Sequence, residues 1–170
     1  MTQSAKLASL GTSNGTSVIV TGQTLATTSG TAATLTGIPS WVKRVTIVLN
    51  SVANSDTNYL SLQLGSGSVQ TTGYAGSLGG VYSGTPSSLG DTAANFYIAN
   101  NVANTPLNGI ITFINVGSNT WVMSGQISNN TARVNMSNGV VTLSGVLDRI
   151  NLLGSSGGSF SAGSINILYE

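Results

Sequence analysis

The sequence contains no histidine and no cysteine, and charge is scarce: five basic and four acidic residues among 170 give a net charge of +1. Without cysteine there is neither a disulfide framework nor a thiolate metal site. Without histidine or paired carboxylates, the groups that usually perform general acid and base catalysis are missing. We therefore expect no catalytic residues, no metal and no cofactor, and we interpret the protein as not an enzyme.

The near-neutral charge also bears on partners. Nucleic acids and anionic lipid surfaces attract basic proteins through long-range fields, and this chain has no basic patch to supply one. No apolar run approaches the length of a membrane span, so membrane insertion is not expected. Residues 1–10 carry one lysine and no long apolar core, so we expect no secretory leader and, for a role outside the cell, release by lysis or by a dedicated machine.

What the chain does have is serine, threonine, asparagine and glycine, which together make up half of it. These small polar residues keep a surface hydrated without charge. The apolar share of 40% is enough for a core. The length and the even composition predict one domain.

Apolar and polar residues alternate with a period of two in short segments separated by Gly, Asn and Ser, which is typical of half-buried antiparallel strands. Val45, Ile47 and Leu49 share one face of such a segment. We predict strands at 16–21, 32–36, 43–49, from 59 onward, 95–99, 109–116, 120–127, 133–137, 140–144, 149–153 and 164–169. The expected fold is all-β: a single antiparallel, jelly-roll-like β-sandwich over 16–170, preceded by an N-terminal arm at 1–15.

Two features of the connections stand out. Asn138-Gly139 lies between two predicted strands and is the commonest signal for a two-residue hairpin turn, so we expect a tight hairpin there. The glycine-rich stretch 65–92 is the longest segment without clear alternation. It is either a functional loop or a meandering connection that hides one strand.

Sugar recognition has a few candidate residues. Amide and hydroxyl groups beside an aromatic ring can bind sugar hydroxyls while the ring supplies an apolar platform. Tyr74, Tyr82 and Tyr97 are candidate platforms, and Asp56 lies among the amides and hydroxyls of 54–58. We name Asp56, Tyr74 and Tyr82 as a candidate recognition loop. The alternative is that the tyrosines pack against strands and that Asp56 occupies a solvated turn.

A second group of residues suggests contacts between subunits. Asp148-Arg149 is the one adjacent pair of an acid and a base, and it reads as a surface pair or a contact across a subunit boundary. Lys43-Arg44 is too small to form a basic patch. Trp41 lies in a strand-like pattern and is assigned to the core or to an interface. We name Trp41, Lys43, Arg44, Asp148 and Arg149 as candidate interface residues.

Segments 37–47 (GIPSWVKRVTI), 144–152 (SGVLDRINL) and 161–170 (SAGSINILYE), with TTGY at 71–74, resemble a family of tailed-bacteriophage virion proteins. These β-rich domains occur as short proteins or at the ends of tail fibres. The likeness covers roughly half of the chain and rests on structural motifs, so it transfers no catalytic residues.

The resemblance implies a structural protein on the exterior of the particle, either a capsid-decoration (cement) protein or a component of a tail appendage. The alternative is a receptor-binding tail-fibre tip or carbohydrate-binding module that recognises a bacterial surface glycan. The implied partners are other virion proteins, of the capsid or the tail, and further copies of the chain, with a homotrimer favoured. The implied location is the virion, assembled in the host cytoplasm and released by lysis.

Overall fold

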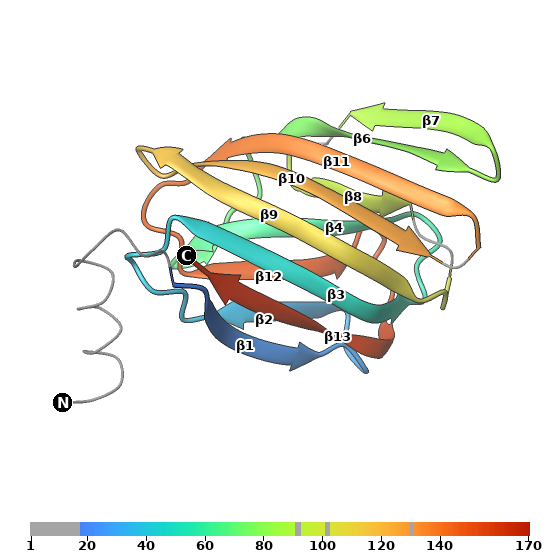
Figure 1. Ribbon diagram of the computed structural model, residues 1–170, viewed down its shortest axis with the longest axis horizontal. Coiled ribbons are helices and arrows are strands. Elements are labelled where there is room, and N and C mark those ends of the chain that lie inside the picture. Colours follow the sequence, from blue (N-terminus) through green and yellow to red (C-terminus); the bar gives the residue numbers. More distant parts are fainter. Residues whose placement is uncertain (1–17, 91–92, 101–102, 130) are drawn as a thin grey trace.

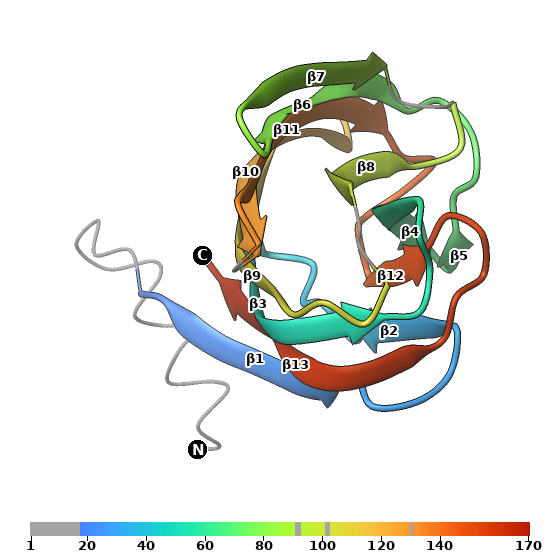
Figure 2. The same cartoon turned by 90° about the vertical axis from the view of Figure 1, so that its right-hand side faces the viewer.

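Two antiparallel sheets pack face to face in the computed structural model (Figure 1 and Figure 2). The structure describes residues 18–90, 93–100, 103–129 and 131–170, so the expected arm at 1–15 lies outside the described residues. The described ranges form strands, turns and bends, which confirms the predicted all-β class and the antiparallel sandwich. Within these ranges, no helix has the length and apolar character needed to cross a membrane.

The larger sheet, sheet A, has eight strands, and the smaller, sheet B, has five. In spatial order, sheet A contains β1 (Val20–Ala26), β13 (Phe160–Tyr169), β3 (Arg44–Asn54), β9 (Leu107–Gly117), β10 (Thr120–Asn129), β11 (Arg133–Thr142), β6 (Ala75–Tyr82) and β7 (Thr85–Gly90). Sheet B contains β2 (Ala32–Thr36), β12 (Arg149–Gly154) and β4 (Tyr59–Ser66), and the far edge of β4 pairs with both β5 (Ser68–Val69) and β8 (Phe96–Asn100).

Strands from the two halves of the chain pair in a nested order: β1 with β13, β2 with β12, β3 with β9, and β4 with β8. A jelly roll requires nested pairs of this kind, but it has eight strands. Here β10, β11, β6 and β7 continue sheet A beyond β9. The jelly-roll part of the expectation therefore stays a prediction.

The core lies between the two sheets and is filled by alternate residues of each strand. Val45, Ile47 and Leu49 all point into it, as their spacing predicts. The largest fully buried side chains are Trp121, Phe96 and Phe113, and the last two rings lie 6.1 Å apart between centroids. Apolar side chains from both sheets thus interdigitate in the way expected of a sandwich.

The predicted hairpin at Asn138-Gly139 is wrong, because β11 runs straight through these residues. A Cβ on Gly139 would come within 2.6 Å of the Phe96 ring and 2.9 Å of the Ala75 carbonyl oxygen. Glycine is needed here for close packing, and not for a turn. The two predicted strands on either side are one strand.

The two-residue turns lie elsewhere in sheet A. Ser118-Asn119 joins β9 to β10, and Ser83-Gly84 joins β6 to β7. All four of these residues have φ between 48° and 85°. Positive φ at both central residues is typical of type I′ turns, whose twist matches that of the flanking strands.

The glycine-rich stretch from residue 65 is largely regular structure. Its described part contains β5 and the hairpin β6–β7, which extends sheet A at the edge of β11. Gly76 and Gly80 occupy positions on β6 that alternate with the outward-facing Val81. Glycine contributes no side chain to either face, so these strands show no period-two pattern in the sequence. The stretch contains β5, β6 and β7, where the sequence predicts one hidden strand at most.

Candidate interaction surfaces

The outward side of sheet A carries an unusual amount of exposed apolar surface. Eight of the eleven exposed large apolar side chains that the structure describes lie on four neighbouring strands of this sheet: Ile110, Ile114 and Val116 on β9, Val122 on β10, Val134, Met136 and Val140 on β11, and Val81 on β6. We call the outward side of β3, β9, β10, β11 and β6 the outer face. Its centre is visible as the broad front of the sheet in Figure 1.

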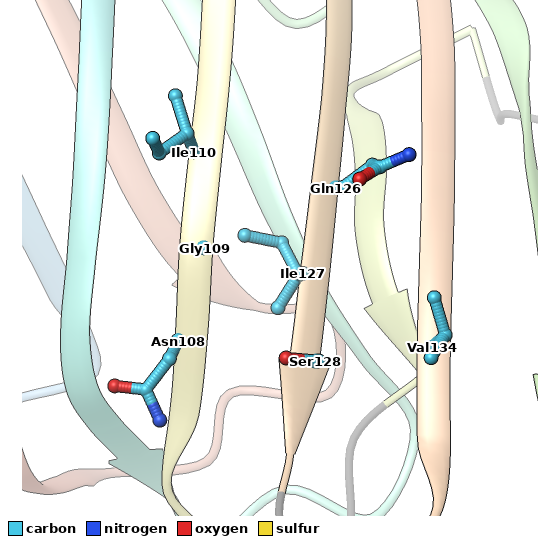
Figure 3. Close-up of a pocket in the computed structure, with 7 residues that line it drawn as sticks. All are labelled: Asn108, Gly109, Ile110, Gln126, Ile127, Ser128 and Val134. Atoms are coloured by element: carbon cyan, nitrogen blue, oxygen red, sulfur yellow. The ribbon is translucent and has the colours of Figure 1, made fainter.

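A shallow depression of about 410 Å³ lies within the outer face. It is lined by seven residues on three neighbouring strands, β9, β10 and β11 (Figure 3): Asn108, Gly109, Ile110, Gln126, Ile127, Ser128 and Val134. None of the seven is charged. The depression therefore offers amide, hydroxyl and aliphatic contacts, and no group that could act as an acid or a base.

One end of the sandwich gathers most of the charge. The connection at 37–43 meets Asp148 through the hydrogen bond from Ile38 N to Asp148 O, at 3.1 Å. The same connection meets the C-terminus, because the backbone nitrogens of Lys43 and Arg44 donate to the Glu170 carbonyl oxygen. We call this the charged end. It holds five of the seven charged residues that the structure describes: Lys43, Arg44, Asp148, Arg149 and Glu170.

Two ion pairs order the charged end. Arg44 Nη1 lies 2.8 Å from Glu170 Oε2, and Arg149 Nε lies 2.8 Å from Asp148 Oδ1. The Asp148 carboxylate also accepts from Gly67 N at 3.0 Å. The hydrogen bond from Arg149 is the main reason that the pKa of Asp148 is below its ordinary value. Both pairs remain partly exposed, so they position side chains more than they stabilise the fold.

Trp41 lies in a turn at the charged end, with 49% of its surface exposed. The strand assignment for this residue is therefore wrong, while its accessibility is compatible with the predicted interface. The structure brings all five candidate interface residues to this one end. It also places Glu170 there, which sequence reasoning missed because an ion pair between residues 44 and 170 leaves no local signal.

The opposite end of the sandwich is rich in tyrosine and asparagine. The rings of Tyr59 and Tyr97 lie 4.6 Å apart, and the Arg133 guanidinium lies 5.1 Å from the centre of the Tyr82 ring. Arg133 Nη1 also donates to Asn100 Oδ1 at 2.9 Å, which ties sheet A to sheet B. We call this the tyrosine end. Burial is the main cause that raises the pKa of Tyr82.

Two candidate recognition residues are not on the surface. Asp56 is 5% exposed and its carboxylate accepts hydrogen bonds from Ser156 N and Asn58 N at 2.6 and 2.9 Å. Tyr74 is 4% exposed and its hydroxyl contacts the backbone of Leu64. The expectation that these two residues face a ligand is wrong, because both satisfy backbone groups within the fold. Tyr82 alone of the three stays partly accessible.

The loop that holds Asp56 is not a solvated turn either, because Asp56 is buried. Asn54 Oδ1 accepts from Asp56 N, and Asn54 Nδ2 donates to Gly158 O, so the loops at 54–58 and 154–158 are locked together. Gly154 and Gly158 allow this close approach, since a Cβ on either would meet Asn54 and Asp56. The amide-rich tip is a structural joint.

Within the described ranges, no group of three or more acidic side chains comes close enough to hold a metal ion. The strongest clusters of functional groups are the outer face, the charged end and the tyrosine end. All three offer contacts for binding. Comparison of the sequence with protein-family models and with curated proteins finds no match.

Proposed function

We propose that this chain is a non-enzymatic structural protein on the exterior of a tailed-bacteriophage particle, as a capsid-decoration protein or a tail-appendage component. The family resemblance supplies the setting, and one structural observation supports the mode of attachment. Five charged residues and the exposed Trp41 meet at the charged end. Tryptophan and arginine are enriched where proteins bind one another.

The start of the described chain lies at the same end. Val20 pairs with Tyr169, so the described chain enters β1 beside the C-terminus. An attachment made through the charged end would leave the tyrosine end directed away from the particle. In this proposal the partners are capsid or tail proteins and further copies of the chain, with a trimer favoured by the resemblance. The protein would be assembled in the host cytoplasm and released by lysis.

Particle incorporation tests the proposal. The gene for this chain would be deleted from the phage genome, and the host cells would supply the wild-type chain, Trp41→Ala or Thr57→Ala in its place. The amount of the chain in purified particles would then be measured. Thr57 is exposed at the opposite end of the sandwich, in the loop before β4, and serves as the control. We expect the wild type and Thr57→Ala in particles, and a folded Trp41→Ala at a level lower by at least about tenfold, corresponding to about 1.4 kcal/mol of lost binding. Absence of the wild-type chain from particles would overturn the proposal.

The second candidate function is recognition of a bacterial surface glycan, and the tyrosine end favours it. Tyr59, Tyr97 and Tyr82 are each partly exposed, and Asn100 and Arg133 lie among them. Ring faces and amides in this arrangement suit the apolar faces and hydroxyls of a neutral sugar. The candidate loop of Asp56, Tyr74 and Tyr82 is thereby replaced by a cluster that shares only Tyr82 with it.

A glycan array prepared from host surface polysaccharides would test this second function. Binding by the wild type that is lost in Tyr97→Ala and kept in Trp41→Ala, a substitution at the charged end, would support it. Tyr97→Phe is the matched variant, because it keeps the ring and should retain most of the binding. If no glycan binds, or if Tyr97→Ala binds as well as the wild type, the tyrosine end is not a glycan site.

A further inference from the structure

The outer face is built of rows that run across the strands, and the rows differ in chemistry. Ile114, Val122 and Val140 are cross-strand neighbours and form one aliphatic row. The next outward row contains Thr112, Ser124 and Asn138, which are small and polar. Such neighbours lie about 4.5–5.5 Å apart between Cβ atoms, so each row is continuous.

The row beyond the polar one is mainly apolar, with Gln126 as its one polar side chain. Val48 pairs with Ile110, Ile110 with Gln126, and Gln126 with Met136. Val134 and Val81 are paired in the row after that. The aliphatic row and the mainly apolar row, with the low polar row between them, form ridges and a groove, and such relief lets two sheets interdigitate when they pack face to face. The depression between Ile110 and Val134 adds a hollow that a protruding side chain can fill (Figure 3).

Charge on the outer face favours a neutral partner. Over the described strands β3, β9, β10, β11 and β6, Arg44 is the one charged residue at an outward position. It is the first residue of β3 and forms an ion pair with Glu170. Arg133 turns inward to Asn100. A nucleic acid or an anionic membrane would find no complementary charge here. A second copy of the same face would add only Arg44, whose charge is already paired with Glu170, so repulsion between the two faces would be small.

The size of the outer face is sufficient for a stable contact. Its five strands are eight to eleven residues long. At about 4.8 Å between strands and about 3.4 Å per residue, they present a footprint of about 800 Å². A specific interface of standard size buries about 800 Å² on each partner. The exposed apolar residues lie on four of these five strands, β9, β10, β11 and β6, so a facing sheet would cover them together.

We propose that the outer face of sheet A is where a second copy of this chain binds, so that the sheets of two copies pack against each other through their aliphatic rows. The contact uses the side of the sandwich and leaves both ends free. It does not depend on attachment to a phage particle, so this inference and the proposed function can fail separately.

The absence of cysteine from the chain allows a direct test. Met136→Cys places a single thiol in the middle of the outer face, and Val146→Cys places one at a position of similar exposure, 51% against 50%, outside it. The rate of maleimide labelling of each thiol would be followed as the concentration of the purified full chain is raised. We expect labelling at position 136 to slow by at least about tenfold, which corresponds to a tenfold excess of the bound state. Labelling at position 146 should stay constant.

Light scattering provides the second measurement. The wild type should have about twice the mass of one 17.1 kDa chain, and Val122→Lys should lower it to 17.1 kDa, since lysine is tolerated on an exposed strand position but not in an apolar interface. Val146→Lys is the control and should keep the wild-type mass. A monomeric wild type, a multimer unaffected by Val122→Lys, or equal labelling at positions 136 and 146 at every concentration would overturn the proposal.

Discussion

The hydroxyl of Tyr74 contacts both polar backbone groups of Leu64, with Leu64 N donating to it at 2.8 Å and Leu64 O lying 3.2 Å away. Along this edge of β4, pairing with β8 ends at Leu62 and pairing with β5 starts at Gly65. Leu64 therefore lies in a gap between two partner strands. Tyr74 fills that gap with a side chain, which explains why it is buried despite its polar group.

Removing this hydroxyl should destabilise the fold. In Tyr74→Phe the buried Leu64 nitrogen loses its acceptor, and a buried unsatisfied backbone donor costs about 1–3 kcal/mol. The free energy of unfolding in urea would measure the loss. Tyr169→Phe is the matched control, because burial alone raises the pKa of Tyr169 and its substitution should cost less. Equal losses in the two variants would contradict the role assigned to Tyr74.

The burial of Tyr74 predicts a loss of stability in alkaline solution. Burial raises the pKa of Tyr74 from 10.0 to about 12, so between these values the folded chain keeps a proton that the unfolded chain releases. Stability should therefore fall as the pH rises from about 10 to 12, by up to about 1.4 kcal/mol per pH unit from this residue. Unfolding measured across this range should show a shallower fall in Tyr74→Phe. An identical slope would contradict the prediction.

Gly139 should not tolerate alanine, because the new Cβ would lie 2.6 Å from the Phe96 ring. Overpacking of this kind costs about 1–3 kcal/mol. Gly79→Ala on the neighbouring strand is the control, since its Cβ would meet nothing closer than Ser87 O at 3.9 Å. Thermal unfolding should show Gly139→Ala destabilised and Gly79→Ala unchanged or slightly stabilised. The reverse order would contradict the packing described for β11.

Asp56→Asn should lower stability. The Asp56 carboxylate accepts hydrogen bonds from two backbone N–H groups, and the amide NH2 of asparagine would face one of these donors with another donor. We expect a loss of about 1–3 kcal/mol in chemical denaturation. Asp148→Asn is the control, because its pair with Arg149 is partly exposed and such pairs contribute about 0–1 kcal/mol. A larger effect at Asp148 than at Asp56 would show that the loop joint has been misassigned.

Much of the strand content could be predicted from the sequence. The range 32–36 coincides with β2, and the predicted strands at 120–127 and 149–153 lie within β10 and β12. Each of these segments has apolar residues at alternate positions, because one face of each meets the core. The strand expected at 16–21 is observed as β1 from Val20 onward, with residues 16 and 17 outside the described range.

The predictions failed where side-chain patterns were ambiguous. The sequence around Gly139 predicts a turn, but glycine serves both tight turns and close packing. The neighbour that decides between them, Phe96, is distant in sequence. The sequence favours exposed positions for Asp56 and Tyr74, because polar groups usually lie at the surface. Their partners, Ser156 and Leu64, become neighbours only when the loops and sheets assemble.

The sequence by itself determined the local properties of this protein: a strand-forming period of two, a chain almost without charge, and no histidine or cysteine. The tertiary structure alone decided which surfaces are available for binding. Along β9, both alternating sets of residues are apolar, with Ile111 and Phe113 on one side and Ile110 and Ile114 on the other. A local pattern cannot say which set a second sheet will cover. Sheet B covers Ile111 and Phe113, and Ile110 and Ile114 remain exposed on the outer face.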